Sequence, residues 1–193
     1  MPAGQGTQEM NADTRFPGFA APAAGFEAPL EMLAACHGRI EQQCQTLARL
    51  AAHLRTHGAD EQARSAAANV MRYFDDAAPK HHADEEQDLF PALLEAMAGS
   101  DAVCIREMEQ RLSGEHRQLE RAWQVLRPAL QSIAAGEGAQ LDCAAVEAFN
   151  RGYAEHLRIE EQELLPMAAR LLDDASLDAI GRAMRARRGI TST

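Results

Sequence analysis

Four histidines are spaced so that a helix bundle could bring them to one level of its core. They are His37, His81, His116 and His156. Between each successive pair, close to the midpoint, lies a segment whose composition is typical of a turn. These segments are residues 57–60, 98–100 and 135–138. If the chain reverses direction at each one, the four imidazoles lie side by side, and with carboxylates one helical turn away they could form a dinuclear metal site.

Each of these histidines is followed, four residues later, by a glutamate. These glutamates are Glu41, Glu85, Glu120 and Glu160. Residues four apart lie on the same helix face, about 6 Å apart along the axis, so both side chains can reach one metal centre. Two such helices facing each other supply two carboxylates that can bridge two ions, and each ion then receives two imidazoles. Such mixed ligands suit iron or manganese, and zinc can also bind them.

The same spacing also occurs by chance, because glutamate is common in this chain. His57 and Glu61 match it, although helix-breaking residues lie between them, and His82 and Glu86 match it at a position expected to turn away from the core. A single histidine in a helix seam is more often a core group with a hydrogen-bond partner. Four at one level favour metal, because burying them without compensation would be costly.

Apolar residues at three-four spacing predict four long helices, and a short one follows them. The expected ranges are about 28–57, 61–97, 101–135, 143–172 and 176–188. Asp60 is a plausible N-cap for the second helix, and Pro79 and Pro91 are expected to bend it. The predicted fold class is therefore all-α, an up-down-up-down four-helix bundle with a short extra C-terminal helix. The basic residues of that last helix are expected to form a solvated face.

The two halves of the chain repeat one design. HGRIEQQCQTL from His37 is similar to HRQLERAWQVL from His116, and HHADEEQDLFP from His81 is similar to HLRIEEQELLP from His156. The repeat predicts two helical hairpins packed with pseudo-twofold symmetry. Each hairpin would bring two helices to the shared core. One contributes a histidine alone, and the other contributes a His-x-x-x-Glu-Glu motif.

Composition and charge narrow the class of protein. The net charge of −10 argues against nucleic acid or an anionic membrane as a partner, and no segment approaches the length of a membrane span. Four cysteines without a C-x-x-C pair, and no visible secretory signal, lead us to expect a reduced, cytoplasmic protein. Residues 1–26 are rich in Pro, Gly and Ala and are expected to be a flexible tail, with the bundle spanning 27–193.

The paired motifs HHADEEQDLFP and HLRIEEQELLP resemble those of the hemerythrin-like family, the HHE cation-binding domains. The resemblance covers about residues 30–172. It implies a non-haem di-iron centre, oxo- or hydroxo-bridged, in which Glu85 and Glu160 bridge the ions. The ligands it implies are His37, His81, Glu85, His116, His156 and Glu160. Aligning the two Glu-Glu-Gln segments favours His81 over His82, while Glu86 and Glu161 are expected to point to water or to an adjacent helix.

The chain departs from the oxygen-carrying hemerythrins, which have two histidines four residues apart on one core helix. Here His116 is followed by Glu120, so the set of four histidines and two glutamates is more similar to bacterial di-iron proteins. The first hypothesis is a di-iron protein that binds or senses O₂, NO or peroxide, or handles iron. The alternatives are a redox enzyme acting on peroxide or nitric oxide, and an iron-responsive interaction or regulatory protein. Glu41 and Glu120 are candidates for a supporting role beside the ligands.

Overall fold

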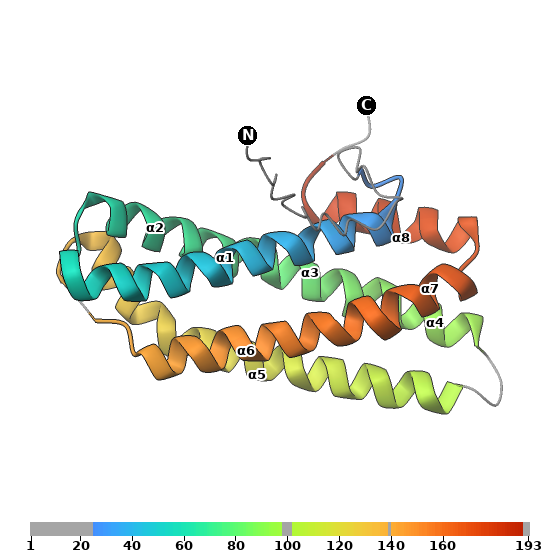
Figure 1. Cartoon of the computed structure of the whole chain (residues 1–193). Coiled ribbons are helices and arrows are strands. Elements are labelled where there is room, and N and C mark those ends of the chain that lie inside the picture. The colour runs from blue at the N-terminus through green and yellow to red at the C-terminus, as the bar shows by residue number, and fades with distance from the viewer. Residues whose placement is uncertain (1–24, 98–101, 139, 191–193) are drawn as a thin grey trace, which may run out of the picture.

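Four long helical segments run antiparallel along one another, as the spacing of the apolar residues predicts (Figure 1). This computed structural model describes residues 25–97, 102–138 and 140–190. The first and third segments are single helices, α1 (Pro29–His57) and α5 (Ala102–Ala135). The second segment comprises α2 (Glu61–Arg72), η1 (Tyr73–Ala77), α3 (Ala78–Asp84), η2 (Glu85–Leu89) and α4 (Phe90–Ala96). The fourth comprises α6 (Cys143–Ile159), η3 (Glu160–Leu164) and α7 (Leu165–Leu171), and α8 (Asp174–Arg187) follows it.

The helix ends follow local signals in the sequence. Asp60 caps α2 by accepting a hydrogen bond from the Ala63 amide, and Asp142 caps α6 by accepting one from Ala144. Gly136, just after α5, has φ of 76°, a left-handed conformation that a residue with a Cβ rarely adopts. The first and third predicted reversals are therefore confirmed. The second, residues 98–100, lies outside the described residues.

Three wide π turns, which the spacing of apolar residues does not predict, interrupt the second and fourth segments. Pro79, Pro91 and Pro166 each lie in the first turn of the α-helix that follows a π turn. A proline lacks the amide hydrogen, and its ring clashes with the carbonyl four residues earlier, so a wider turn relieves the clash. Pro128 lies inside α5, which the structure gives as continuous α-helix, so proline alone does not produce the feature. Glu85 and Glu160 are the first residues of two of these turns.

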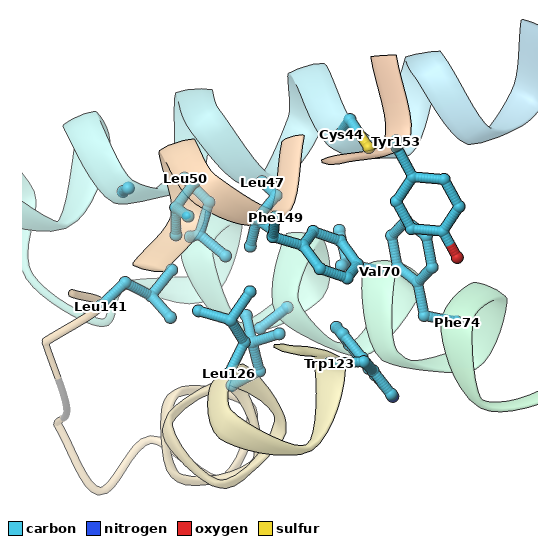
Figure 2. Packing of buried hydrophobic residues seen from close by; sticks show 14 of the residues in the cluster. Cys44, Leu47, Leu50, Val70, Phe74, Trp123, Leu126, Leu141, Phe149 and Tyr153 are labelled. Carbon is cyan, nitrogen blue, oxygen red and sulfur yellow. The ribbon is translucent and has the colours of Figure 1, made fainter. Parts of the chain in front are cut away.

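Two apolar clusters fill the bundle and leave a polar layer between them. One cluster extends toward the loops that follow α1 and α5 (Figure 2). It contains the aromatic side chains of Phe74, Trp123, Phe149 and Tyr153. The other lies toward α4, α7 and α8 and includes Phe90. Phe74 and Phe149, which align in the sequence repeat, pack edge to face with their ring centroids 5.0 Å apart. Equivalent positions of the two hairpins therefore meet in the core, as the predicted pseudo-symmetry requires.

The C-terminal helix α8 packs against α1 and α3 (Figure 1). The expectation of a solvated basic face is wrong for two of its arginines. Arg187 and Arg188 donate hydrogen bonds to Asp84, which is fully buried in α3, and their side chains are only 18% and 16% exposed. The sequence pattern showed the basic cluster, but it did not show that a buried carboxylate on another helix would pair with it.

The predicted flexible tail, residues 1–26, lies almost entirely outside the described residues. Within the parts of the chain that are described, no helix combines the length and apolar character needed to cross a membrane.

Candidate metal centre

The structure brings all six candidate ligands together in the polar layer. Each is at most 4% exposed. They are His37 from α1, His81 from α3, Glu85 from η2, His116 from α5, His156 from α6 and Glu160 from η3. Every long segment thus contributes one histidine, and the two segments that contain the His-x-x-x-Glu-Glu motif also contribute a carboxylate.

The six side chains form two overlapping sets with the geometry of metal ligands. In one set, the donor atoms of His37, His81 and both glutamates lie within 4.8 Å of one another. In the other set, the donor atoms of His116, His156 and the same two glutamates meet the same criterion. Each hairpin therefore contributes two imidazoles to its own set, and the two carboxylates belong to both sets.

The individual distances show how each carboxylate connects the two sets. Glu160 places one oxygen 2.9 Å from Nε2 of His156 and the other 3.3 Å from Nε2 of His37. Glu85 places one oxygen 3.6 Å from Nε2 of His81 and the other 3.3 Å from Nε2 of His116. A carboxylate that faces both sets in this way is arranged as a bridge between two cations.

The atoms that face the centre lack hydrogen-bond partners among the described residues. They are Nε2 of His37, His81, His116 and His156 and both carboxylate oxygens of Glu85 and Glu160. Buried polar atoms are nearly always paired, because each unpaired group costs about 1–3 kcal/mol. So many orphaned atoms converging on one point fit cations bound to nitrogen and oxygen donors.

Three further glutamates contact three of the four imidazoles on the side that faces away from the centre. Glu161 accepts from Nδ1 of His37 at 3.3 Å, Glu86 from Nδ1 of His116 at 2.8 Å, and Glu115 from Nδ1 of His156 at 3.0 Å (each carboxylate comes from a neighbouring helical segment). A carboxylate can only accept, so in a neutral imidazole Nδ1 carries the proton and the Nε2 lone pair faces the centre. Metal-binding histidines are oriented in this way.

The two candidates for this supporting role, Glu41 and Glu120, are not the glutamates that contact the imidazoles. Glu41 and Glu120 follow their histidines by four residues, yet both are exposed. Glu86 and Glu161 do reach an adjacent helix, as expected, and what they contact there is a candidate ligand. Glu115 was missed altogether. It precedes His116 on α5 but contacts His156 on α6, and no spacing within one helix reveals a contact between two helices.

Burial and contacts with carboxylates together set the pKa values of the groups in the centre. Burial lowers the pKa of His81 to about 3, so this imidazole is neutral near pH 7. It raises the pKa of Glu85, and the Glu160 carboxylate raises it further. Burial alone would lower the pKa of His116, but its contacts with Glu160, Glu85 and Glu86 raise that pKa to about 10. Glu85 and His116 therefore tend to hold protons, and bound cations could replace these protons.

Comparison with known proteins agrees with this chemistry. The family model described as Hemerythrin HHE cation binding domain matches residues 28–168. A protein of Haemophilus influenzae, described as an uncharacterized protein, is 32% identical over 167 residues. That alignment covers 86% of this chain and 94% of the other protein. The matched region contains all six candidate ligands and the three glutamates that contact them.

Proposed function

Because this chain belongs to the hemerythrin HHE cation-binding family, we propose that it is a non-haem di-iron protein that binds or senses a small ligand. The ligands we propose for the two ions are the six buried residues of the polar layer, with Glu85 and Glu160 as bridges. O₂, NO and peroxide are the candidate small ligands, and the handling of iron itself is a related role. Manganese or zinc could occupy the same donors.

The observation that carries this proposal is the convergence of unpartnered donor atoms. Within the described structure, four imidazole nitrogens and four carboxylate oxygens face one another with no hydrogen-bond partner. Leaving such groups buried and uncompensated is unfavourable, whereas two divalent cations would more than offset the charge of the two carboxylates and bind nitrogen and oxygen lone pairs that are otherwise unused. The sharing of both carboxylates by the two sets of donors supports two ions rather than one.

The protein's own contribution is to position these donors and keep water away from them. Glu86, Glu115 and Glu161 fix three imidazoles with Nε2 toward the centre, and the two apolar clusters close the layer from both sides. A pair of iron ions bound there would supply redox chemistry and coordination positions for a small ligand.

Spectroscopy of the loaded protein tests the small-ligand role. Protein reconstituted with ferrous iron without oxygen should change its absorption spectrum when O₂, NO or peroxide is added. The change should be absent from a Glu85→Ala/Glu160→Ala variant treated in the same way. An unchanged spectrum with all three ligands would contradict this role, even if the protein holds iron.

Steady turnover separates a binding protein from a redox enzyme. If the protein consumes peroxide or nitric oxide over many cycles with a physiological reductant, the enzyme hypothesis is favoured. If each centre reacts once and then stops, binding or sensing accounts for the result.

One observation favours an iron-responsive regulatory role as a second candidate. Asp84 lies between the candidate ligands His81 and Glu85 in the sequence, and it is bound by Arg187, the last residue of α8, and by Arg188, which follows it. A change in metal occupancy could therefore alter how firmly α8 is held. A partner that binds only the metal-free or only the iron-loaded protein would support this role, and equal binding to both forms would contradict it.

A further inference from the structure

A cavity of about 490 Å³ lies between α5 and the second helical segment, on the outer side of the candidate metal centre. Its rim includes the exposed side chains of Gln87, Arg117 and Gln124, and its floor includes the buried side chains of His116 and Trp123. Because His116 is a candidate ligand, the cavity reaches from the surface to the wall of the centre. Its volume is typical of a small-molecule site and far exceeds that of a diatomic molecule.

The His82 side chain lies between this cavity and the centre. It lines the cavity, and one of its ring nitrogens lies within 4.8 Å of nitrogens of His116 and His156. Its ring stacks on the His116 ring, with centroids 4.0 Å apart and planes 11° apart. Rings stacked in parallel hold their in-plane lone pairs in separate planes, so the two imidazoles do not converge on one ion. His82 is therefore placed to close the cavity rather than to bind metal.

The His82 ring lacks the anchor that fixes three of the ligand imidazoles. His37, His116 and His156 each contact a glutamate through Nδ1. Nε2 of His82 is buried without a partner in the described residues, and the ring packs against other rings, including that of Tyr153. A ring held by packing can turn into the adjacent cavity without losing a hydrogen bond at Nε2. Such a side chain can open and close a route to the centre.

The charges that line the cavity disfavour anions. Carboxylates of Asp75, Glu86 and Glu120 line it, whereas Arg117 supplies the one guanidinium among the described lining residues. Arg117 pairs with Glu86, and Arg127 pairs with Asp75, which leaves Glu120 as the excess carboxylate at the rim. An anion that enters would meet this negative charge, whereas an uncharged molecule would not.

We propose that this cavity is the route by which an uncharged small molecule reaches the centre, with His82 as its gate and Glu120 disfavouring anions. The proposal rests on the proposed function and deepens it. It narrows the class of ligand to uncharged molecules such as O₂, NO and hydrogen peroxide, at the expense of anions such as nitrite and azide.

The fluorescence of Trp123 tests entry into the cavity in metal-free protein. Trp123 is the only tryptophan of the chain, is 5% exposed and lines the cavity. We expect uncharged acrylamide to quench it more strongly than the iodide anion does. Glu120→Lys should increase quenching by iodide. The matched control, Glu107→Lys, makes the same charge change at an exposed position on α5 outside the cavity lining, and it should not. Absence of quenching by acrylamide, or equal responses of the two lysine variants, would overturn the proposed route.

The rate of NO binding to protein loaded with ferrous iron tests the gate. Ala83 is half-buried in the cavity wall, so Ala83→Phe should fill the cavity and slow binding about tenfold. Removing the gate ring in His82→Ala should speed binding about tenfold. The controls Ala52→Phe and His57→Ala change exposed positions on α1 and should bind NO at the wild-type rate. Stopped-flow absorbance would give the rates, and iron content per chain should equal that of the wild type in all four variants.

The outcomes separate this inference from the proposed function. If the wild type binds NO and both cavity variants bind it at the same rate, the gate is wrong and the small-ligand function stands. If His82→Ala holds fewer irons than the wild type, His82 is a ligand and its assignment as a gate is overturned. If the iron-loaded wild type does not respond to NO, O₂ or peroxide, the proposed function fails and this inference fails with it, whatever the fluorescence of the metal-free protein shows.

Discussion

At the scale of single residues, the centre depends on carboxylates that never face the metal. Glu86, Glu115 and Glu161 accept the Nδ1 protons of three imidazoles and so fix the direction of each ring. An imidazole without such a partner can rotate or take the other tautomer, and either change lowers its value as a ligand. Effects on metal affinity should therefore appear at residues that contact the ligands.

Replacing Glu115 tests this outer contact. We predict that Glu115→Ala lowers metal affinity about 10–100-fold, because His156 loses the acceptor for its Nδ1 proton. Chelator competition would measure the affinity. Glu107→Ala is the matched control, because Glu107 is exposed on the same helix, and its affinity should equal that of the wild type. Equal affinities for all three proteins would show that the contact is incidental.

Replacing a ligand by an apolar residue should have opposite effects on stability and on metal binding. Both ring nitrogens of His81 are buried without a partner in the described residues, so His81→Leu removes an unfavourable burial. We predict a higher free energy of unfolding for the metal-free variant than for metal-free wild type, measured in urea with a chelator present. Metal binding should fall sharply. A less stable metal-free variant would indicate that the His81 ring is satisfied by a contact we have not recognised.

At the scale of elements, α8 is fastened to the segment that contains two of the ligands. Arg187 and Arg188 bind Asp84, and Arg187 also donates to Asp88 in η2 at 2.7 Å. Asp84 is fully buried, so its charge is compensated by these arginines. The last helix therefore stabilises the same turn that presents Glu85.

Breaking this contact should loosen α8 before the rest of the bundle. We predict that Asp84→Asn lowers the free energy of unfolding by on the order of 3 kcal/mol, since Arg188, which is only partly exposed, then has no carboxylate to pair with, whereas Arg187 keeps Asp88. Hydrogen exchange should show faster exchange in α8 than in α5. Arg182→Ala serves as the control, because Arg182 is exposed on α8 and should leave exchange unchanged. Unaltered protection of α8 in Asp84→Asn would mean that apolar packing alone holds it.

Sequence patterns within single helices predicted the helical segments and the residues that face the core, but they did not predict the contacts between helices. The spacing of apolar residues predicted the long segments, and Asp60 predicted the start of α2, because these signals act within a few residues. The π turns at Glu85 and Glu160 were not predicted. A nearby proline is not enough to predict a π turn, because Pro128 lies inside the continuous α-helix α5. The pairing of Glu115 with His156 depends on how α5 and α6 pack, which no single-helix period encodes.

At the scale of the whole molecule, the bundle consists of two apolar clusters separated by a layer of ionisable groups. The clusters favour folding, whereas burying the layer opposes it unless cations are bound. Ligand that binds only the folded state adds RT ln(1 + [L]/Kd) to stability. The stability of this protein should therefore depend on its metal.

Metal removal should lower the melting temperature of the whole bundle. We predict a lower Tm after chelation and recovery when ferrous iron is restored without oxygen, because the unfolded chain cannot form the site. Differential scanning calorimetry would measure both states. The Glu85→Ala/Glu160→Ala variant should melt at the same temperature with and without metal. Identical melting of the metal-free and iron-loaded wild type would show that the layer is stable without cations.

The iron content per chain tests the central claim most directly. Wild-type protein loaded with ferrous iron without oxygen, then freed of unbound metal, should hold two irons per chain, while Glu85→Ala/Glu160→Ala should hold fewer. On exposure to air, the wild type should acquire the absorption of an oxo-bridged ferric pair. Protein that holds no iron, or a single ion with no spectral change, would contradict a di-iron centre built from these six residues.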